Sequence, residues 1–311
     1  MRTRTLTQGA AGYPLSLWRW SRMTGARPPP LYLRGELPAK PGVAIVGTRK
    51  PTPEGQRFAG ELAAAGGRAG YAVWSGGAKG IDGCAHRVAL EVGAPTVVVM
   101  AGGLDRPPYP RSHRDLFRQV LDAGGAWLSL NPDGTRRYRS SFLARNGVIA
   151  ALSVATVMVQ GDERSGACNA MDKARRMGRP TFAVPHAPWE ERGRGCLLQM
   201  AHGAIPVGSA LEFVDGVRRL AEEDAPGGLE EQQLTLFEEP SDDGHRVLAA
   251  LSDVPTHIDR LCERCALPYP RVATRLADFI AHGIVVEPTT GYYRRMLWVC
   301  ANDPQAVGKK R

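Results

Sequence analysis

Short apolar runs alternate with helical patterns over residues 42–220. The runs are nearly free of charged residues and cover residues 42–47, 71–76, 96–102, 126–130, 155–160 and 181–185. Helices are predicted between and after them, over residues 55–69, 81–92, 115–123, 143–152, 167–177 and 210–220. Strands that are buried on both faces cannot alternate with polar residues, and a parallel sheet covered by helices on both sides buries them in this way. The pattern therefore predicts an α/β fold with a doubly wound, mostly parallel sheet.

The segments on either side of this pattern differ from it in composition. Residues 1–40 carry aromatic residues and prolines without a long helical period, so we expect an arm packed on a domain of residues 41–221. Residues 222–243 are acidic and have few anchors for a core, which is typical of a linker. A small domain over residues 244–302 and a basic tail, 303–311, are predicted to follow.

The predicted small domain has the pattern of a winged helix, a helix-turn-helix variant. Its expected elements are helices over residues 246–251, 258–265 and 270–282 and a hairpin at Thr290 and Gly291. Four arginines lie on the predicted recognition helix and wing: Arg271, Arg275, Arg294 and Arg295. The neighbouring Val272 and Ala273 can hardly read base edges, so we expect contact with a partner rather than sequence reading of duplex DNA.

The charge of the chain indicates a polyanionic partner. The formal charge is +9, and acidic residues crowd the predicted linker, so the folded parts are more basic than the total suggests. Nucleic acid is the commonest polyanion for such a protein, and a generally cationic surface is the plain alternative. The sequence has no apolar run of about 18 residues and no signal peptide pattern, and its six scattered cysteines suit reduced thiols. We expect a cytoplasmic protein that does not contact a membrane.

Glycine-rich turns follow several of the predicted strands. Backbone amides in such turns, and the helix N-termini after them, approach phosphates closely. The turns match neither the dinucleotide fingerprint nor the P-loop, so phosphate contact is expected without mononucleotide hydrolysis. The alternative is that the glycines only make tight turns. The residues concerned are Gly47, Thr48 and Arg49, then Ser75, Gly76, Gly77, Lys79 and Gly80, and finally Ser165 and Gly166.

The densest basic and aromatic cluster lies farther along the chain. It consists of Arg136, Arg137, Arg139, Phe142, Arg145 and Asn146. Arginines that anchor phosphates beside a ring that stacks a base are typical of single-strand binding. The alternative is that Phe142 belongs to the core and that the arginines form a solvated loop. The carboxyl ends of parallel strands meet at one edge of an open α/β sheet, and ligands bind there. We therefore expect the glycine-rich turns that follow the strands to lie together at this edge.

The chain resembles the DNA-processing protein A family, also called DprA or Smf. The resemblance is carried by VGTR (46–49), SGGAKGIDGCAH (75–86), GLD (103–105), YP (109–110), FLARN (142–146), SGA (165–167), AVP (183–185) and HGA (202–204), preceded by YP (13–14) and PLY (30–32). It implies an extended Rossmann-like fold, a homodimer, and a recombination mediator that binds single-stranded DNA and hands it to a RecA-type recombinase in natural transformation. It implies no cofactor.

Carried over residue by residue, the resemblance assigns a DNA pocket to Arg49, Gly76, Gly77, Lys79, Arg139, Phe142, Arg145 and Asn146. The sequence also departs from the family pattern at Gly147, where a second arginine is usual, and at Leu130, Gln160-Gly161, Asn169 and Leu197. An altered pocket floor is therefore expected.

Three residues bear on the question of an enzymatic function. Asp82 and His86 lie four apart on one predicted helix face and Asp105 lies in a loop, but no nucleophile with a neighbouring base is specified. Phosphoribohydrolases that resemble the Lonely Guy enzymes, or a sensor of a nucleotide ligand, are the alternative classes. We expect no catalytic residues.

Cys262 and Cys265 form a CxxC pair that raises the question of a zinc site. His257, His282 and Cys300 are the further candidate ligands. The pair lies within a predicted helix, and no second pair follows at the spacing of a zinc finger. Buried thiols that pack the small domain are therefore the favoured interpretation.

Overall fold

The computed structural model describes residues 2–10, 12–14, 16–223, 243, 246–247, 250–251, 254–281 and 285–295. The chain divides into two compact units, Met1–Asp224 and Ala225–Arg311. The predicted basic tail, His282, Cys300 and nearly all of the predicted acidic linker lie outside the described residues.

A nine-stranded sheet runs through the larger unit in the order β1-β2-β6-β5-β4-β3-β7-β8-β9. Strands β3 to β9 are parallel to one another, and β1 and β2 are antiparallel additions at one edge. The strands are β1 (Arg4–Leu6), β2 (Leu31–Gly35), β3 (Gly42–Val46), β4 (Ala72–Ser75), β5 (Thr96–Met100), β6 (Ala126–Ser129), β7 (Ala155–Met158), β8 (Thr181–Ala183) and β9 (Ile205–Pro206). The doubly wound, mostly parallel sheet predicted from the apolar runs is confirmed.

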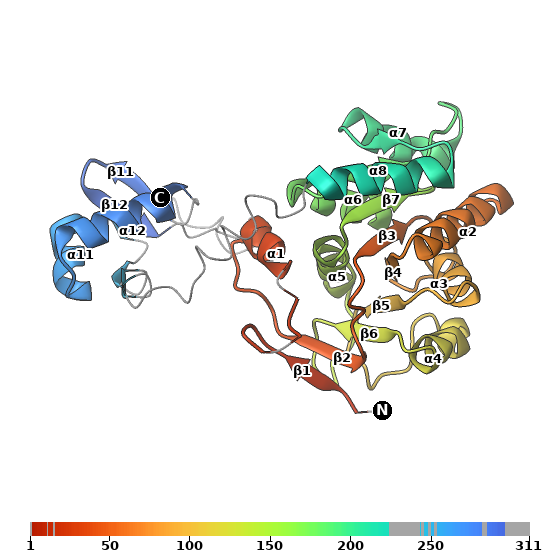
Figure 1. Cartoon of the computed structure of the whole chain (residues 1–311), viewed down its shortest axis with the longest axis horizontal. Helices are drawn as coiled ribbons and strands as arrows, with labels where there is room; N and C mark the ends of the chain where they lie inside the picture. The colour runs from red at the N-terminus through yellow and green to blue at the C-terminus, as the bar shows by residue number, and fades with distance from the viewer. Residues whose placement is uncertain are drawn as a thin grey trace, which may run out of the picture. The chain divides into compact units, whose positions relative to one another are not determined.

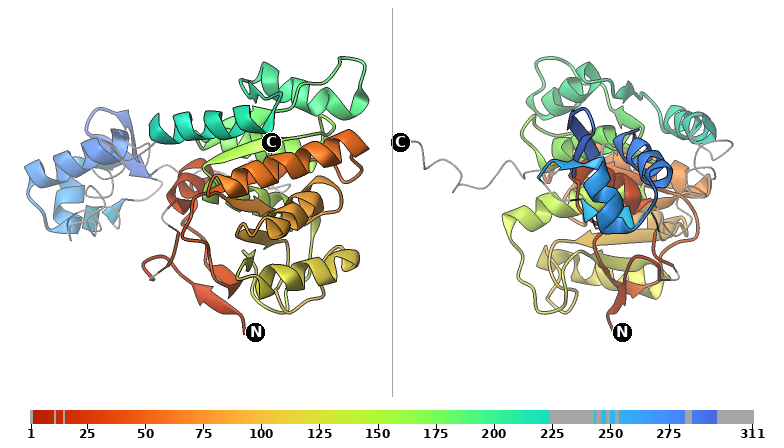
Figure 2. Two further views of the ribbon diagram at one scale, coloured as in Figure 1. Left: turned by 45° about the vertical axis from the view of Figure 1, so that its right-hand side comes forward. Right: turned by 90° about the vertical axis from the view of Figure 1, so that its left-hand side faces the viewer.

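Helices cover both faces of this sheet (Figure 1, Figure 2). One face carries α2 (Pro53–Arg68), α3 (Ile81–Glu91), α4 (Arg114–Asp122) and α8 (Ala210–Glu223), and the other carries α1 (Leu17–Thr24), α5 (Arg139–Leu152), α6 (Gly166–Arg176) and α7 (Arg194–Ala201). In β3, Val43 and Ile45 pack into the first layer while Ala44 packs into the second. Because successive side chains of a strand point to opposite faces, burial on both faces removes the polar alternation.

The N-terminal arm contributes secondary structure that the sequence pattern did not predict. Strand β2 pairs with β6, with Tyr32 opposite Ser129, and alternate residues Leu31 and Leu33 are fully buried. Helix α1 packs on α5. The arm therefore extends the sheet and covers part of one face.

Helix α5 begins at Arg139, earlier than the predicted start at Leu143. The other predicted helices of the larger unit begin within two residues of the observed ones. The early start places Arg139, Phe142 and Arg145 at intervals of three on the first turns of one helix. Residues three apart are neighbours on a helix surface, so Phe142 lies beside both arginines, while Arg139 and Arg145, six apart, point in different directions.

The smaller unit has the winged-helix fold that its pattern predicted. It contains β10 (Thr256–His257), α11 (Ile258–Cys265), α12 (Tyr269–Ala281), β11 (Val285–Thr289) and β12 (Tyr292–Arg295), with a three-stranded sheet in the order β10-β12-β11. Gly291 has φ +80° at the hairpin turn, a conformation that glycine adopts without strain. Leu261, Val272 and Leu276 lie in its core.

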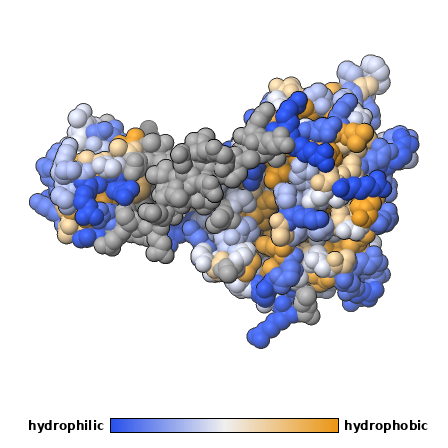
Figure 3. Space-filling view, viewed as in Figure 1, coloured by the Kyte–Doolittle hydropathy of each residue, from blue (hydrophilic) through white to orange (hydrophobic). Residues whose placement is uncertain are grey.

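The surface of the larger unit mixes residue types. On the face shown in Figure 3, small hydrophobic patches lie between hydrophilic residues. Among the described residues, no helix is both long enough and apolar enough to span a membrane.

Candidate nucleic-acid interface

The turns after strands β3 to β8 meet at one edge of the sheet, called here the carboxyl edge. The strand order reverses between β3 and β7, because the chain proceeds from β3 through β4 to β6 on one side and then returns to β7 on the other. At this point Thr48 N donates a 2.7 Å hydrogen bond to Gln160 O, which ties the two turns together. Open α/β sheets bind ligands at such a switch point.

Four glycines of the carboxyl edge are required by packing. A Cβ on Gly76 would lie 2.4 Å from Arg145 Nη2, and one on Gly47 would lie 2.5 Å from Ile81 Cγ1. Gly77 and Gly80 have φ of +68° and +81°, and their Cβ atoms would lie 2.4 Å from Phe117 Cζ and 2.3 Å from Thr48 O. By contrast, no atom lies within 4 Å of a Cβ built on Gly166. Close packing explains four of the five glycines, whatever they bind.

The hydroxyl groups of these turns also have structural partners. Ser75 Oγ donates to Ile45 O at 2.7 Å and is fully buried. Ser165 Oγ accepts from Cys168 N at 3.2 Å and caps helix α6. Thr48 Oγ1 accepts from Lys50 N at 3.3 Å. These hydrogen bonds therefore fix the backbone conformation of the three turns.

Three exposed cations lie at the carboxyl edge, where the turn after β7 also exposes Asp162 and Glu163. Arg49, Lys79 and Arg139 are all exposed. Within the described part of the chain, none of these three side chains has a hydrogen bond or an ion pair. Cations that are free of protein partners are available to an anionic ligand.

Arg145 lies beneath the glycine turn rather than on the surface. It is 8% exposed, and Nη1 donates to Gly76 O and, at 2.9 Å, to Val99 O. Burial lowers its pKa to about 10, while the nearby carboxylate of Asp82 acts in the opposite direction. Burial likewise raises the pKa of Asp82, and the charge of Arg145 opposes that shift. The two buried groups therefore stabilise each other's charge below the turn.

Asn146 connects the helices on the second face of the sheet. Its Nδ2 donates to Gly166 O at 3.0 Å and to Asn169 Oδ1 at 3.1 Å. Asn169, one of the departures from the family pattern, thus holds Asn146 in place.

Phe142 is half-buried and belongs to none of the core clusters of the described residues. Its ring meets Tyr109 edge-on, with centroids 5.8 Å apart and an interplanar angle of 70°. The guanidinium of Arg145 lies 5.2 Å from the Phe142 centroid. Tyr109 was not singled out as a site residue from the sequence, because nothing in its loop pattern shows which way the ring faces.

Two further departures from the family pattern have clear surroundings. A Cβ on Gly147 would lie 3.0 Å from the Trp20 ring, so this position faces the arm and not the glycine turn. Gln160 is buried, and its Oε1 accepts from Thr52 N at 3.0 Å. Nothing in the structure explains Leu130 or Leu197.

Asp82 and His86 are buried and Asp105 is exposed, and all three side chains are bonded within the protein. His86 Nδ1 lies 2.7 Å from Thr96 Oγ1, and burial lowers the pKa of His86 to about 3. Asp82 Oδ2 accepts from Ala78 N at 3.2 Å. Asp105 accepts from Gly134 N at 2.8 Å. These contacts give each of the three residues a structural role.

Some of the candidate groups of the smaller unit have partners or lie in its core. Arg271 pairs with Asp243. Cys265 is buried, Cys262 packs against the same core, and burial raises the pKa of both thiols. In the described part of the chain, no group of three or more His, Cys, Asp or Glu residues could hold a metal ion.

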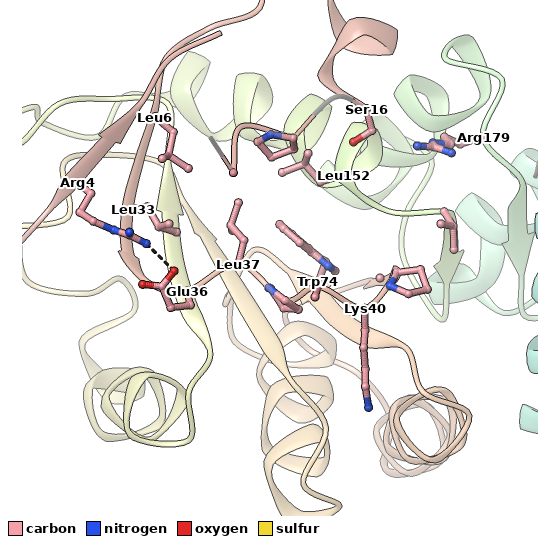
Figure 4. A pocket seen from close by; sticks show the side chains of 17 residues that line it. Arg4, Leu6, Ser16, Leu33, Glu36, Leu37, Lys40, Trp74, Leu152 and Arg179 are labelled. Carbon is pink, nitrogen blue, oxygen red and sulfur yellow. Dashed lines mark hydrogen bonds and ion pairs between the residues drawn. The ribbon is translucent and has the colours of Figure 1, made fainter. Parts of the chain in front are cut away.

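A cavity of about 490 Å³ lies at the opposite end of the strands. It is lined by Gly42 at the start of β3, by Val154 just before β7 and by residues of the arm. Figure 4 shows Leu37, Leu152 and Trp74 around it, with the Arg4–Glu36 ion pair to one side. The cavity is separate from the carboxyl edge.

A doubly wound, mostly parallel sheet with glycine turns at its switch point defines a Rossmann-like α/β protein. The chain belongs to the DNA recombination-mediator protein A family, known as DprA or Smf. The sequence profile of that family matches residues 4–218, and the profile of the DprA winged helix domain matches residues 235–279.

Individual relatives agree with this assignment. Protein Smf of Synechocystis is 33% identical over 93% of this chain and 80% of its own length, and protein Smf of Escherichia coli is 30% identical over 91% and 75%. The structure of DprA from Streptococcus pneumoniae matches with a TM-score of 0.62 and 28% identity over 69% of this chain and 74% of that chain. DprA of Helicobacter pylori, whose structure concerns its single-stranded DNA binding mode, matches with a TM-score of 0.61 and 28% identity over 70% and 96%.

Proposed function

We propose that this protein binds single-stranded DNA at the carboxyl edge and acts as a recombination mediator. The observation that carries the proposal is the presence of three exposed, unpaired cations, Arg49, Lys79 and Arg139, at the same edge of the sheet as the half-buried ring of Phe142. Cations track a phosphate backbone and rings stack bases without regard to sequence. The single-stranded DNA binding mode of the related H. pylori protein supports the same ligand.

The proposed roles follow burial. Arg49, Lys79 and Arg139 contact phosphates directly, and Phe142 stacks a base. Arg145 is buried below the Gly76 carbonyl, so it positions the turn and adds charge from beneath. The turns of Gly47, Gly76, Gly77, Gly80 and Gly166, with Thr48, Ser75 and Ser165, bring backbone amides and a helix N-terminus toward the phosphates. Asn146 orients α5 against α6.

Binding of a fluorescent oligothymidine, followed by anisotropy, tests this function. We expect tight binding that weakens steeply with salt, and much weaker binding of a duplex. Replacing Arg49 with alanine should reduce the slope of log K against log salt by about 0.7, the value for one phosphate contact on a single strand.

The matched control is Arg68→Ala. Arg68 is also exposed, but it lies in the last turn of α2, at the opposite edge of the sheet. Its removal should leave binding and the salt slope unchanged. Equal affinity for duplex, or tight binding of a mononucleotide with none of the oligothymidine, would overturn the proposal and favour the enzyme or sensor classes.

Replacing Phe142 with alanine should weaken oligothymidine binding by about 1–3 kcal/mol with an unchanged salt slope, because stacking releases no counterions. Stability should fall by well under the ~3–5 kcal/mol of a core phenylalanine, since the ring lies outside the core clusters. Melting temperature and a salt series on the same preparation measure both effects. Normal binding by a folded Phe142→Ala protein would remove stacking from the mechanism.

We further propose that the protein works as a homodimer and passes the bound strand to a RecA-type recombinase during natural transformation. The description of the family as a recombination mediator supports this role. We propose a partner-binding role for the winged helix; the pairing of Arg271 with Asp243 already engages one of the four arginines that duplex DNA would need.

A further inference from the structure

The loops after β5 and β6 are joined into one surface, called here the two-loop shelf (residues 103–109 and 132–138). Gly103 N donates to Thr135 O at 3.1 Å, and Gly134 N donates to Asp105 Oδ1 at 2.8 Å. Two arginine side chains add cross-links: Arg106 to Gly134 O and Arg137 to Pro107 O, each at 2.7 Å. A loop pair that is bonded at so many points presents its side chains in fixed positions.

Two exposed aromatic rings stand on this shelf. Tyr109 is 46% exposed and Tyr138 is 60% exposed. Tyr109 is held from two sides, by the edge-on contact with Phe142 and by the guanidinium of Arg137, which lies 5.6 Å from its ring centroid. The ring of Tyr109 is therefore fixed in place and still open to solvent, immediately next to the ring that is proposed to stack a base.

The charge around the shelf suits a polyanion. Its acidic side chains already have partners within the protein: Asp105 accepts from Gly134 N, and Asp133 lies 3.7 Å from Arg34. Arg111 and Arg136 are exposed, and in the described part of the chain neither side chain has a hydrogen bond or an ion pair. Unpaired guanidinium groups beside an exposed ring are the combination that single-strand binding uses.

We propose that the two-loop shelf is a second nucleotide subsite, in which Tyr109 stacks the base next to the one on Phe142 and Arg111 and Arg136 contact the adjoining phosphates. The inference rests on the proposed function. It adds that the bound DNA strand leaves Phe142 across the two-loop shelf. It predicts that affinity depends on strand length through Tyr109.

The test is a series of oligothymidines from about three to about twelve nucleotides long, a range that spans the site of a single fold. For Tyr109→Ala, binding of the shortest strand that the unaltered protein holds should stay within about twofold. Binding of the longer strands should fall by about tenfold to a hundredfold, the loss of one stacked base. Tyr109→Phe should behave as the unaltered protein, because it keeps the ring.

Two further variants make the result specific. Leu211→Ala removes a side chain that is 73% exposed on α8 and should change no member of the series. Arg136→Ala should lower the salt slope for long strands only, which tests the subsite even if Tyr109→Ala fails to fold.

Three outcomes would overturn the subsite: Tyr109→Ala binds long strands normally, it loses short and long strands equally, or Arg136→Ala leaves every slope unchanged. If the unaltered protein binds no oligothymidine of any length, the proposed function itself is wrong. The two failures are therefore distinguishable.

Discussion

Replacing Arg145 with methionine is expected to lower the free energy of unfolding by about 3–5 kcal/mol, because it leaves the buried carboxylate of Asp82 without its main opposite charge. The substitution also removes the hydrogen bonds from Nη1 to Gly76 O and Val99 O. Urea unfolding of the two proteins measures the difference. Oligothymidine binding should weaken as well, since the glycine turn loses its support.

The double variant Arg145→Met/Asp82→Asn separates the two causes. A neutral amide needs no opposite charge, so the double variant should recover a large part of the lost stability. If it is no more stable than Arg145→Met alone, the hydrogen bonds to the carbonyl oxygens account for the effect and the charge explanation is wrong.

The deficit of Arg145→Met should also depend on pH in a defined direction. Burial raises the pKa of Asp82 above its ordinary value of 3.8, and loss of Arg145 raises it further. A carboxyl whose pKa is raised by folding destabilises the folded state only where it ionises in the unfolded chain. The deficit should therefore be smallest below the folded-state pKa of Asp82 in the unaltered protein, which itself lies above 3.8. It should grow as the pH rises through that pKa and level off above the higher folded-state pKa of Asp82 in Arg145→Met.

Replacing Gly80 with alanine is expected to cost about 3 kcal/mol of stability, from the sum of a disfavoured backbone conformation and a steric clash. Gly80 has φ +81°, and its Cβ would lie 2.3 Å from Thr48 O. That oxygen accepts from Ile81 N at 3.2 Å, so it cannot move away without breaking the contact between two turns of the carboxyl edge.

Gly166→Ala is the control for Gly80→Ala. It lies in another turn of the same edge, has no atom within 4 Å of its Cβ and has no positive φ. Its stability should change by no more than about 0.5 kcal/mol. Denaturant unfolding of both variants measures their free energies of unfolding. Equal losses in the two variants would contradict the steric explanation for Gly80.

The central strands were predictable from sequence, and the arm was not. Burial of Val43 and Ile45 on one face and Ala44 on the other leaves a continuous apolar run that can be read directly. Strand β2 is short, and its partner β6 lies far along the chain, with Tyr32 opposite Ser129. Such long-range antiparallel pairing has no local signal, so the arm could only be described as packed on the domain.

The depth of each residue at the candidate site could not be read from the sequence. The sequence grouped Arg139, Phe142 and Arg145, but it did not show that Arg145 is buried under the glycine turn while Arg139, at the start of α5, is exposed. The contact between Tyr109 and Phe142 depends on how two loops bond to each other. Neither burial nor loop pairing follows from local periodicity.

The position of β3 has a consequence for synthesis on the ribosome. This strand lies in the middle of the sheet, and one of its two neighbours, β7, is translated only after β4, β5 and β6, with Val43 opposite Ala155. Until β7 has emerged, one edge of β3 keeps its backbone hydrogen-bonding groups unpaired, and such an edge invites association with other chains. The nascent protein therefore depends on completion of β7 before the central sheet is closed, and premature termination before that strand leaves a product prone to aggregation.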